Sequence, residues 1–379
     1  MMTFAETEDD DDKHATIELL SRDLRKAAVT MTPQEARFLV DAYYSMQKQR
    51  IVQSNRKFAM EDEPHTVIKW FADQTYTLEK QVKAALDKYS AAQPMGEWMR
   101  KIVGVGPVIA AGLLAHIDIK KAPTVGHIWS FAGLNPEATW LGGSAAEKAV
   151  RLFSEPKKPA DIQRLLQIAA HAPCCAKWLS RLVYRQATGE EPPFRNLGRE
   201  HSAEDYVKVM LHDVKFTNDH LLMALSKRPW NAELKTLLWK LGESMKRFST
   251  RENCYYGHLY RAKKAEYVGM SETGLYKQKA EDSLKKKNYS KTTEAYKAYK
   301  QGKYPPGRLD LMAMRYSTKR FLADMHLVWY WKEFGILPPV PYVFAIAGHS
   351  HYEMAPSVAD VPDLAEELAK RWPEARRGV

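Results

Sequence analysis

The sequence predicts an all-α protein. We expect a helical hairpin or coiled coil, followed by a helical domain that contains a helix-hairpin-helix and carries an inserted helical module. Apolar residues recur at helical spacing over 66–91 and again over 230–248. No alternating apolar and polar pattern long enough for a strand is present. Proline and glycine stand at expected helix ends, as at Pro33, Pro107 and Gly133.

The first helices are expected to form a hairpin over 31–92. Thr32-Pro33-Gln34-Glu35 is a capping box with proline at the first helical position, and it predicts a helix to about Gln53. A second helix is predicted over 66–91. Its expected apolar stripe comprises Val67, Trp70, Phe71, Gln74, Leu78, Val82, Ala85, Leu86 and Tyr89. A coil of this length either packs on itself or makes a homo-oligomer, and the sequence leaves both open.

A helix-hairpin-helix is predicted within 93–141. An apolar helix end leads into Gly104-Val105-Gly106, then Pro107 and a helix of small residues. Glycine can take positive φ and lets a phosphate approach the bare backbone. Proline suits the first helical position, and the free amide groups there attract anions. A plain αα-hairpin with a glycine cap is the alternative. The proposed backbone contacts are Gly104, Val105 and Gly106, with Lys101, Lys120 and Lys121 nearby.

The remaining chain divides by composition. Residues 142–226 are predicted to be an inserted helical module bounded by turns. Residues 227–335 form a basic helical part, in which the Lys- and Tyr-rich stretch 269–306 is expected to be mobile without a partner. Residues 336–379 contain a Pro-rich segment and a C-terminal helix that Asp360 is expected to cap.

The charge distribution favours a polyanionic partner. The formal net charge is +11 and the isoelectric point is about 9.2. Lys and Arg far outnumber Asp and Glu between 227 and 332, where tyrosines are interleaved with them. Aromatic side chains among cations can stack on bases. Residues 1–30 have the opposite charge, and this acidic tail is predicted to be disordered.

Other classes of protein are disfavoured. No apolar run could span a bilayer and the acidic N-terminus is unlike a signal peptide, so we expect a cytoplasmic protein with no membrane partner. Cysteine occurs only at Cys174, Cys175 and Cys254, which fits a reducing compartment and no zinc site. His349 and His351 are interpreted as a surface pair rather than metal ligands. No metal or other cofactor is therefore expected.

Two segments form a recognisable pair, Val103–Ile117 and Trp129–Pro136. They resemble the hallmark of the C-terminal transposase domain in the insertion-sequence transposases of the 110/116/902 group. Leu78–Asp87 resembles the coil that precedes this domain. Lys227–Leu238 resembles a later helix of the family, and Arg315–Leu322 resembles its closing helix.

The resemblance extends over 34–141 and 227–354. It implies DNA binding in transposition or recombination by a protein of a mobile element or phage. It also implies a structured RNA as guide, because family members use one. On these helices we add as nucleic-acid contacts Lys227, Arg228, Arg315, Lys319 and Arg320.

Two departures from the family leave enzymatic activity open. Family members carry an N-terminal RuvC-like nuclease domain with four metal-binding carboxylates. In this chain, the residues before the helix-hairpin-helix are instead predicted to be helices and an acidic tail. The family's catalytic serine follows the second hallmark segment, and the nearest match, Ser144, is out of register. The chain is therefore either a transposase or recombinase, or a non-catalytic DNA- or RNA-binding or assembly protein. We expect any DNA cleavage by it alone to be metal-independent or absent.

Overall fold

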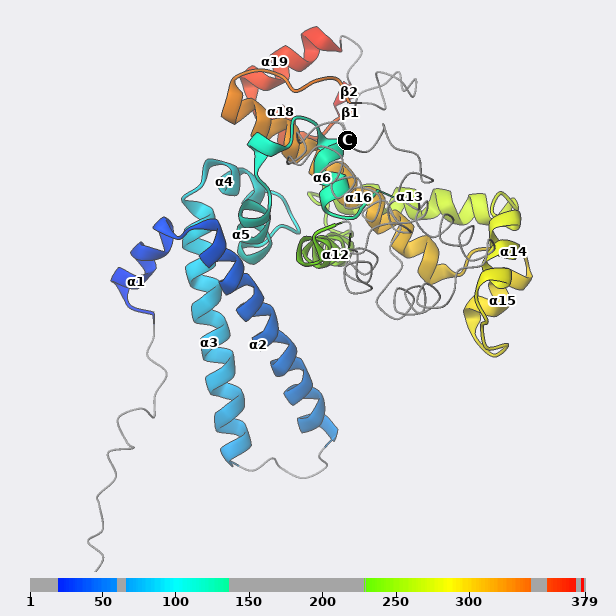
Figure 1. Cartoon of the computed structure of the whole chain (residues 1–379), viewed down its shortest axis with the longest axis horizontal. Coiled ribbons are helices and arrows are strands. Elements are labelled where there is room, and N and C mark those ends of the chain that lie inside the picture. The colour runs from blue at the N-terminus through cyan, green and yellow to red at the C-terminus, as the bar shows by residue number, and fades with distance from the viewer. Residues whose placement is uncertain are drawn as a thin grey trace, which may run out of the picture. The chain divides into compact units, whose positions relative to one another are not determined.

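The structure is a computed structural model that describes residues 20–59, 66–135, 228, 230–341, 353–372 and 376–377. These residues are almost entirely helical, which confirms the all-α class (Figure 1). Within them, strands β1 (Glu353–Met354) and β2 (Arg376–Arg377) make one short parallel pair. The chain divides into two compact units, residues 1–125 with 237–379, and residues 126–236.

The N-terminal elements are α1 (Arg22–Ala27), the 3₁₀-helix η2 (Ala28–Thr30), α2 (Pro33–Ala59) and α3 (Thr66–Ala91). The capping box before α2 is present. The Thr32 amide donates to Glu35 Oε2 at 2.6 Å, and the Glu35 amide donates to Thr32 Oγ1 at 3.3 Å. These two bonds satisfy donors that a helix start leaves free. The helices α2 and α3 run antiparallel side by side, as the hairpin prediction required (Figure 1).

The predicted apolar stripe of α3 is buried along only half of the helix. Leu86 and Tyr89 lie in a core with Val40 of α2 and Val108 of α5. At the other end, Val67 is 61% exposed, and Trp70 and Phe71 are half exposed. The expectation of one continuous buried stripe is therefore wrong for the half of α3 beside which the described residues place no third helix.

The next elements are α4 (Pro94–Arg100), α5 (Pro107–His116), η3 (Ile119–Lys121), α6 (Val125–Phe131), α12 (Ala232–Arg247) and α13 (Tyr255–Glu272). The helix α5 is apolar on every side, as a central helix must be. Ala110, Ala111 and Leu113 are fully buried. It packs on α2, α3 and α4, so it joins the hairpin to the rest of this unit.

The stretch 269–306, expected to be mobile, is instead mainly helical. It contains α14 (Lys277–Lys286) and α15 (Glu294–Lys300), which pack on each other and lead into the long helix α16 (Pro306–Phe334). Tyr276 and Tyr304 stack with ring centroids 4.4 Å apart, and Tyr299 meets Tyr304 edge-on at 6.2 Å. Buried tyrosines supply the core that the charged composition concealed.

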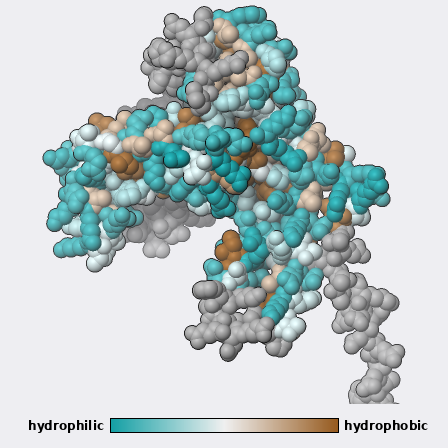
Figure 2. All heavy atoms as spheres, turned by 180° about the vertical axis from the view of Figure 1, so that it is seen from behind, coloured by the Kyte–Doolittle hydropathy of each residue, from teal (hydrophilic) through white to brown (hydrophobic). Residues whose placement is uncertain are grey.

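The described residues 337–341 after α16 have no regular secondary structure, and the C-terminal part contains α18 (Pro356–Ala359) and α19 (Pro362–Arg371). Asp360 does not cap α19. Its amide closes α18 by donating to Pro356 O at 3.0 Å, and Val361 is the N-cap of α19. Trp98 Nε1 donates to Ser357 O at 2.8 Å, which holds α18 against α4. On the face drawn in Figure 2, hydrophilic side chains predominate and hydrophobic ones form small groups.

Candidate nucleic-acid interface

The turn between α4 and α5 presents a helix start to solvent. Gly106 is the N-cap of α5, with extended backbone angles of φ −82° and ψ 171°, and Pro107 occupies the first helical position. The preceding turn is closed by the Val105 amide, which donates to Ile102 O at 3.0 Å. Because the first amide groups of a helix have no acceptor inside the helix, this end carries free donors and the positive end of the dipole.

The fold of the protein requires glycine at position 104. Its φ of +98° lies in the region that favours glycine. A Cβ at this position would lie 3.2 Å from Met245 Cγ, so α12 also packs close to the bare backbone. Part of the hallmark is therefore explained by conformation and packing.

Gly106 has different surroundings. Its φ is negative, so this residue does not use the positive φ that glycine allows. It is exposed, and a Cβ built on it would meet no atom within 4 Å. Nothing in the described fold demands glycine here, while a ligand that approaches the backbone would. Val105, by contrast, is buried, so only its backbone faces the turn.

The helix α12 packs beside this turn and beside α5. A Cβ on Gly112 of α5 would lie 2.6 Å from Leu237 Cδ2, so the two helices approach closely. Beyond Met245, α12 ends with the exposed Arg247, and Arg251 follows in the next loop. Cys254 is buried beside that loop, where its thiol lies 3.8 Å from Val103 O, and burial raises the pKa of this thiol.

Arg247 and Arg251 were not among the predicted contacts. The apolar stripe of α12, which ends at Met245, was the available sequence signal, but it did not show that Met245 meets Gly104. The structure brings the C-terminal end of α12 to the turn and so adds two exposed guanidinium groups to the candidate surface.

The three predicted lysines are exposed and paired with carboxylates. Lys101 Nζ lies 3.4 Å from Glu97. Lys120 and Lys121 each lie 3.0 Å from a carboxylate, of Glu333 and Asp118 respectively. Exposed ion pairs of this kind contribute little to stability, so a phosphate can replace the carboxylate at small cost.

The cations of α16 differ in their surroundings. Arg315 is exposed. Lys319 is partly buried, and burial first, then the charge of Arg315, lowers the pKa of its ammonium group. Arg320 Nε lies 3.2 Å from the carboxylate of Asp324, which is buried. Arg320 therefore serves an internal ion pair in this structure, whereas Arg315 faces solvent.

Another cluster of charges lies between α12, α13 and α16. Asp310 accepts from Lys246 at 2.6 Å, from Lys264 at 2.7 Å and from the Tyr260 hydroxyl at 2.5 Å. Burial alone would raise the pKa of Asp310, but these hydrogen bonds lower it to about 2. Asp310 thus binds two helices to α16 as an internal ion-pair partner.

The smaller unit brings the second hallmark segment beside the residues that precede α12. The Asn231 amide donates to Phe131 O at 2.8 Å, and Asn231 Oδ1 accepts from the Leu234 amide at the start of α12. Gly133 has φ +65°, and a Cβ on it would lie 2.6 Å from Trp230 Cγ. Segments about a hundred residues apart are therefore neighbours in space.

Several predictions concern residues outside the described ranges. They are Lys227, Ser144, the inserted module, the histidine pair and most of the acidic tail. Arg228 is described and exposed. In the described part of the chain, no group of three or more His, Cys, Asp or Glu side chains could hold a metal ion. No helix there is long and apolar enough to cross a membrane.

The comparison with protein families agrees with the hallmark. The profile of the Transposase IS116/IS110/IS902 family matches residues 97–152. No curated protein and no solved structure matches the chain. The matched range begins within α4 and contains the exposed turn and all of α5. The segment built around Gly104, Gly106 and Pro107 is therefore similar to the transposase IS116/IS110/IS902 family.

Proposed function

We propose that this chain binds the backbone of DNA through the α4–α5 turn and acts as a transposase-like protein in transposition or recombination. The observation that carries the proposal is Gly106, an exposed N-cap with open space where a side chain would stand. A phosphate there would meet free amide groups at a helix start. The family match and the exposed cations on both sides of the turn support the same partner.

The test is Gly106→Val, measured by fluorescence anisotropy with labelled duplex DNA at several salt concentrations. Valine suits the extended backbone at this position, so the fold should persist. Its side chain would block the phosphate, and losing one charge-assisted contact weakens binding about tenfold or more. Gly269→Val is the matched control, because Gly269 is also exposed with nothing within 4 Å. Wild-type affinity in Gly106→Val at every salt concentration would refute the proposal.

The lysines provide a second measurement. Replacing Lys101, Lys120 or Lys121 by glutamine should lower the slope of log affinity against log salt by up to about one unit each. An unchanged slope in all three variants would place the duplex elsewhere on the protein.

The competing function is a non-catalytic DNA- or RNA-binding or assembly protein with the same domain. A cleavage assay distinguishes the two functions. The protein is incubated with supercoiled and branched DNA in Mg²⁺ or in EDTA. A recombinase that uses the serine would give strand cleavage or a covalent protein–DNA product that is lost in Ser144→Ala. The absence of both products would favour the non-catalytic protein.

A structured RNA is the second proposed partner, on the resemblance to the family alone. Sequencing the nucleic acid that purifies with the protein from its host tests this directly. Enrichment of one structured RNA over total cellular RNA would support it, and recovery of DNA alone would not.

A further inference from the structure

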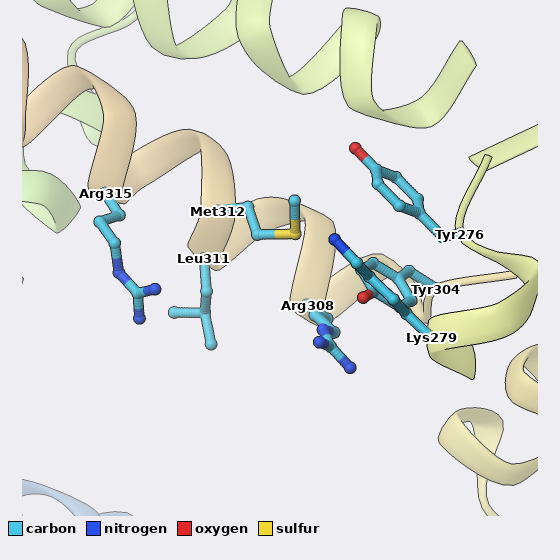
Figure 3. A pocket seen from close by; sticks show the side chains of 7 residues that line it. All are labelled: Tyr276, Lys279, Tyr304, Arg308, Leu311, Met312 and Arg315. Atoms are coloured by element: carbon cyan, nitrogen blue, oxygen red, sulfur yellow. The ribbon is translucent and has the colours of Figure 1, made fainter. Parts of the chain in front are cut away.

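A second cationic site lies between α14 and the first turns of α16. It is a pocket of about 460 Å³, a volume suited to a nucleotide-sized ligand. Figure 3 shows Arg308, Leu311 and Arg315 extending from α16 to one side, with Lys279 across from them. Its lining includes three cations and no carboxylate. Such a lining selects an anionic ligand.

Arg308 is held in place before any ligand arrives. Its Nη1 atom donates to Ser283 Oγ and to Tyr299 Oη, each at 3.1 Å, and its guanidinium lies 3.8 Å from the Tyr304 ring centroid. Tyr304 is in turn stacked on Tyr276. A cation fixed in this way loses little side-chain entropy when it binds.

Within the described residues, no carboxylate pairs with Lys279, Arg308 or Arg315. This distinguishes the pocket from the turn between α4 and α5, where the lysines have acidic neighbours. The three charges of the pocket therefore remain available to a phosphate.

Helical spacing sets the distance between the cations. Arg308 and Arg315 are seven residues apart on α16, which is about 10 Å along the axis, too far for one phosphate to bridge. Leu311 lies between them and is 50% exposed, and Met312 forms the neighbouring wall. An exposed apolar side chain between two cations suits a base or sugar flanked by phosphates. In a duplex the bases are enclosed, so the surface favours a single strand.

We propose that this pocket binds a single-stranded segment of nucleic acid. Its phosphates would contact Arg308, Arg315 and Lys279, and one unstacked base would lie against Leu311 and Met312. The site is separate from the α4–α5 turn, and the proposal stands or falls independently of duplex binding there.

The test measures the affinity of the full chain for oligo-dT and oligo-rU of about 12 nucleotides, and for duplex DNA, by fluorescence anisotropy. Arg315→Gln should weaken binding of the single strands about tenfold, and Leu311→Ser about threefold to tenfold. The duplex affinity of Leu311→Ser should stay within about twofold of the wild type, since the duplex lacks an accessible base. Equal losses of affinity for oligo-dT and oligo-rU would show that the pocket binds both single-stranded DNA and single-stranded RNA. A loss for one oligonucleotide alone would assign the pocket to that nucleic acid.

Lys285→Gln is the matched control, because Lys285 is an exposed cation of α14 outside the pocket lining. Arg315 and Leu311 are exposed, so neither change should unfold the protein, and circular dichroism checks this. Wild-type affinity of both variants for both single strands would overturn the proposal. So would an equal loss of duplex binding in Leu311→Ser, or competition by an acidic peptide as strong as that by oligo-dT.

Discussion

At the scale of single residues, the α4–α5 turn contains two glycines with opposite structural demands. Gly104 has φ +98° and little room for a Cβ beside Met245, while Gly106 has a negative φ and open space. We expect Gly104→Ala to lower the free energy of unfolding by about 1–3 kcal/mol, because alanine is strained at this φ. Gly106→Ala should leave stability almost unchanged. Urea titrations followed by circular dichroism compare the two.

This pair of variants separates folding from binding. Equal stability of Gly104→Ala and wild type would mean that the turn adopts another conformation in solution. A large loss of stability in Gly106→Ala would mean that Gly106 also has a structural role, and the binding result for Gly106→Val would then need a different variant.

Asp310 links stability to pH at the same scale. Its pKa in the folded protein is lowered to about 2 from an ordinary value near 3.8. A lowered pKa stabilises the fold fully above the unfolded value and loses that contribution as the pH falls through the folded value. The shift corresponds to about 2 kcal/mol at neutral pH.

Asp310→Asn should therefore lower the free energy of unfolding at pH 7 by about 2 kcal/mol, since Lys246 and Lys264 lose their charged partner. The difference from wild type should shrink between about pH 4 and pH 2. Urea unfolding of both proteins across this range measures it. A constant difference at every pH would show that the carboxylate charge contributes nothing.

At the scale of elements, the sequence predicted most helices but not what covers them. The bounds of α3 and the capping box of α2 follow from local signals, which act within a few residues. The helices α14 and α15 were missed because their core consists of tyrosines in a lysine-rich context. Burial of Tyr276, Tyr299 and Tyr304 depends on α16, and composition carries no information about that contact.

The exposed half of α3 predicts self-association. Val67, Trp70 and Phe71 recur at helical spacing and are at least half exposed. We expect a second copy of the chain to cover them. The exposed half of α3 would pack against the same half of α3 in the second copy, which makes a self-complementary interface. Trp70→Ser combined with Phe71→Ser should then shift the protein from dimer to monomer in multi-angle light scattering.

Trp239→Ser is the matched control, since Trp239 is a similarly exposed tryptophan on α12. It should leave the oligomeric state unchanged. A wild-type protein that is monomeric at tens of micromolar would contradict the prediction, as would a dimer that persists in the double variant.

At the scale of the whole molecule, long-range contacts determine which residues make up the candidate site. The hallmark identifies the turn from a short stretch of sequence, and its residue types are enough to predict a helix start with an open N-cap. The partner helix α12 lies more than a hundred residues later, and its contacts with Gly104 and Gly112 have no local signature. Arg247 and Arg251 could not be assigned to the turn for this reason.

The same kind of contact predicts that residues 143–226 can be removed. The amide of Asn231 donates to Phe131 O, and Trp230 packs on Gly133, so the chain before this segment already lies beside the chain after it. A short Gly/Ser linker therefore closes a small gap, and shortening a loop between neighbouring points costs little entropy. Replacing 143–226 by such a linker should give a helical protein that unfolds cooperatively.

The control for this replacement is a second version that also carries Trp230→Ala. If the contact between Trp230 and Gly133 holds the two flanks together, this version should melt at a lower temperature than the replacement alone, because the packing of the indole on Gly133 is lost. Limited proteolysis of the intact chain gives an independent measurement. Cuts confined to 143–226 should leave two fragments that still elute together, held by the packing of α5 against α12. Fragments that separate, or a replacement that lacks a cooperative transition, would show that residues 143–226 complete the core and are not an insertion.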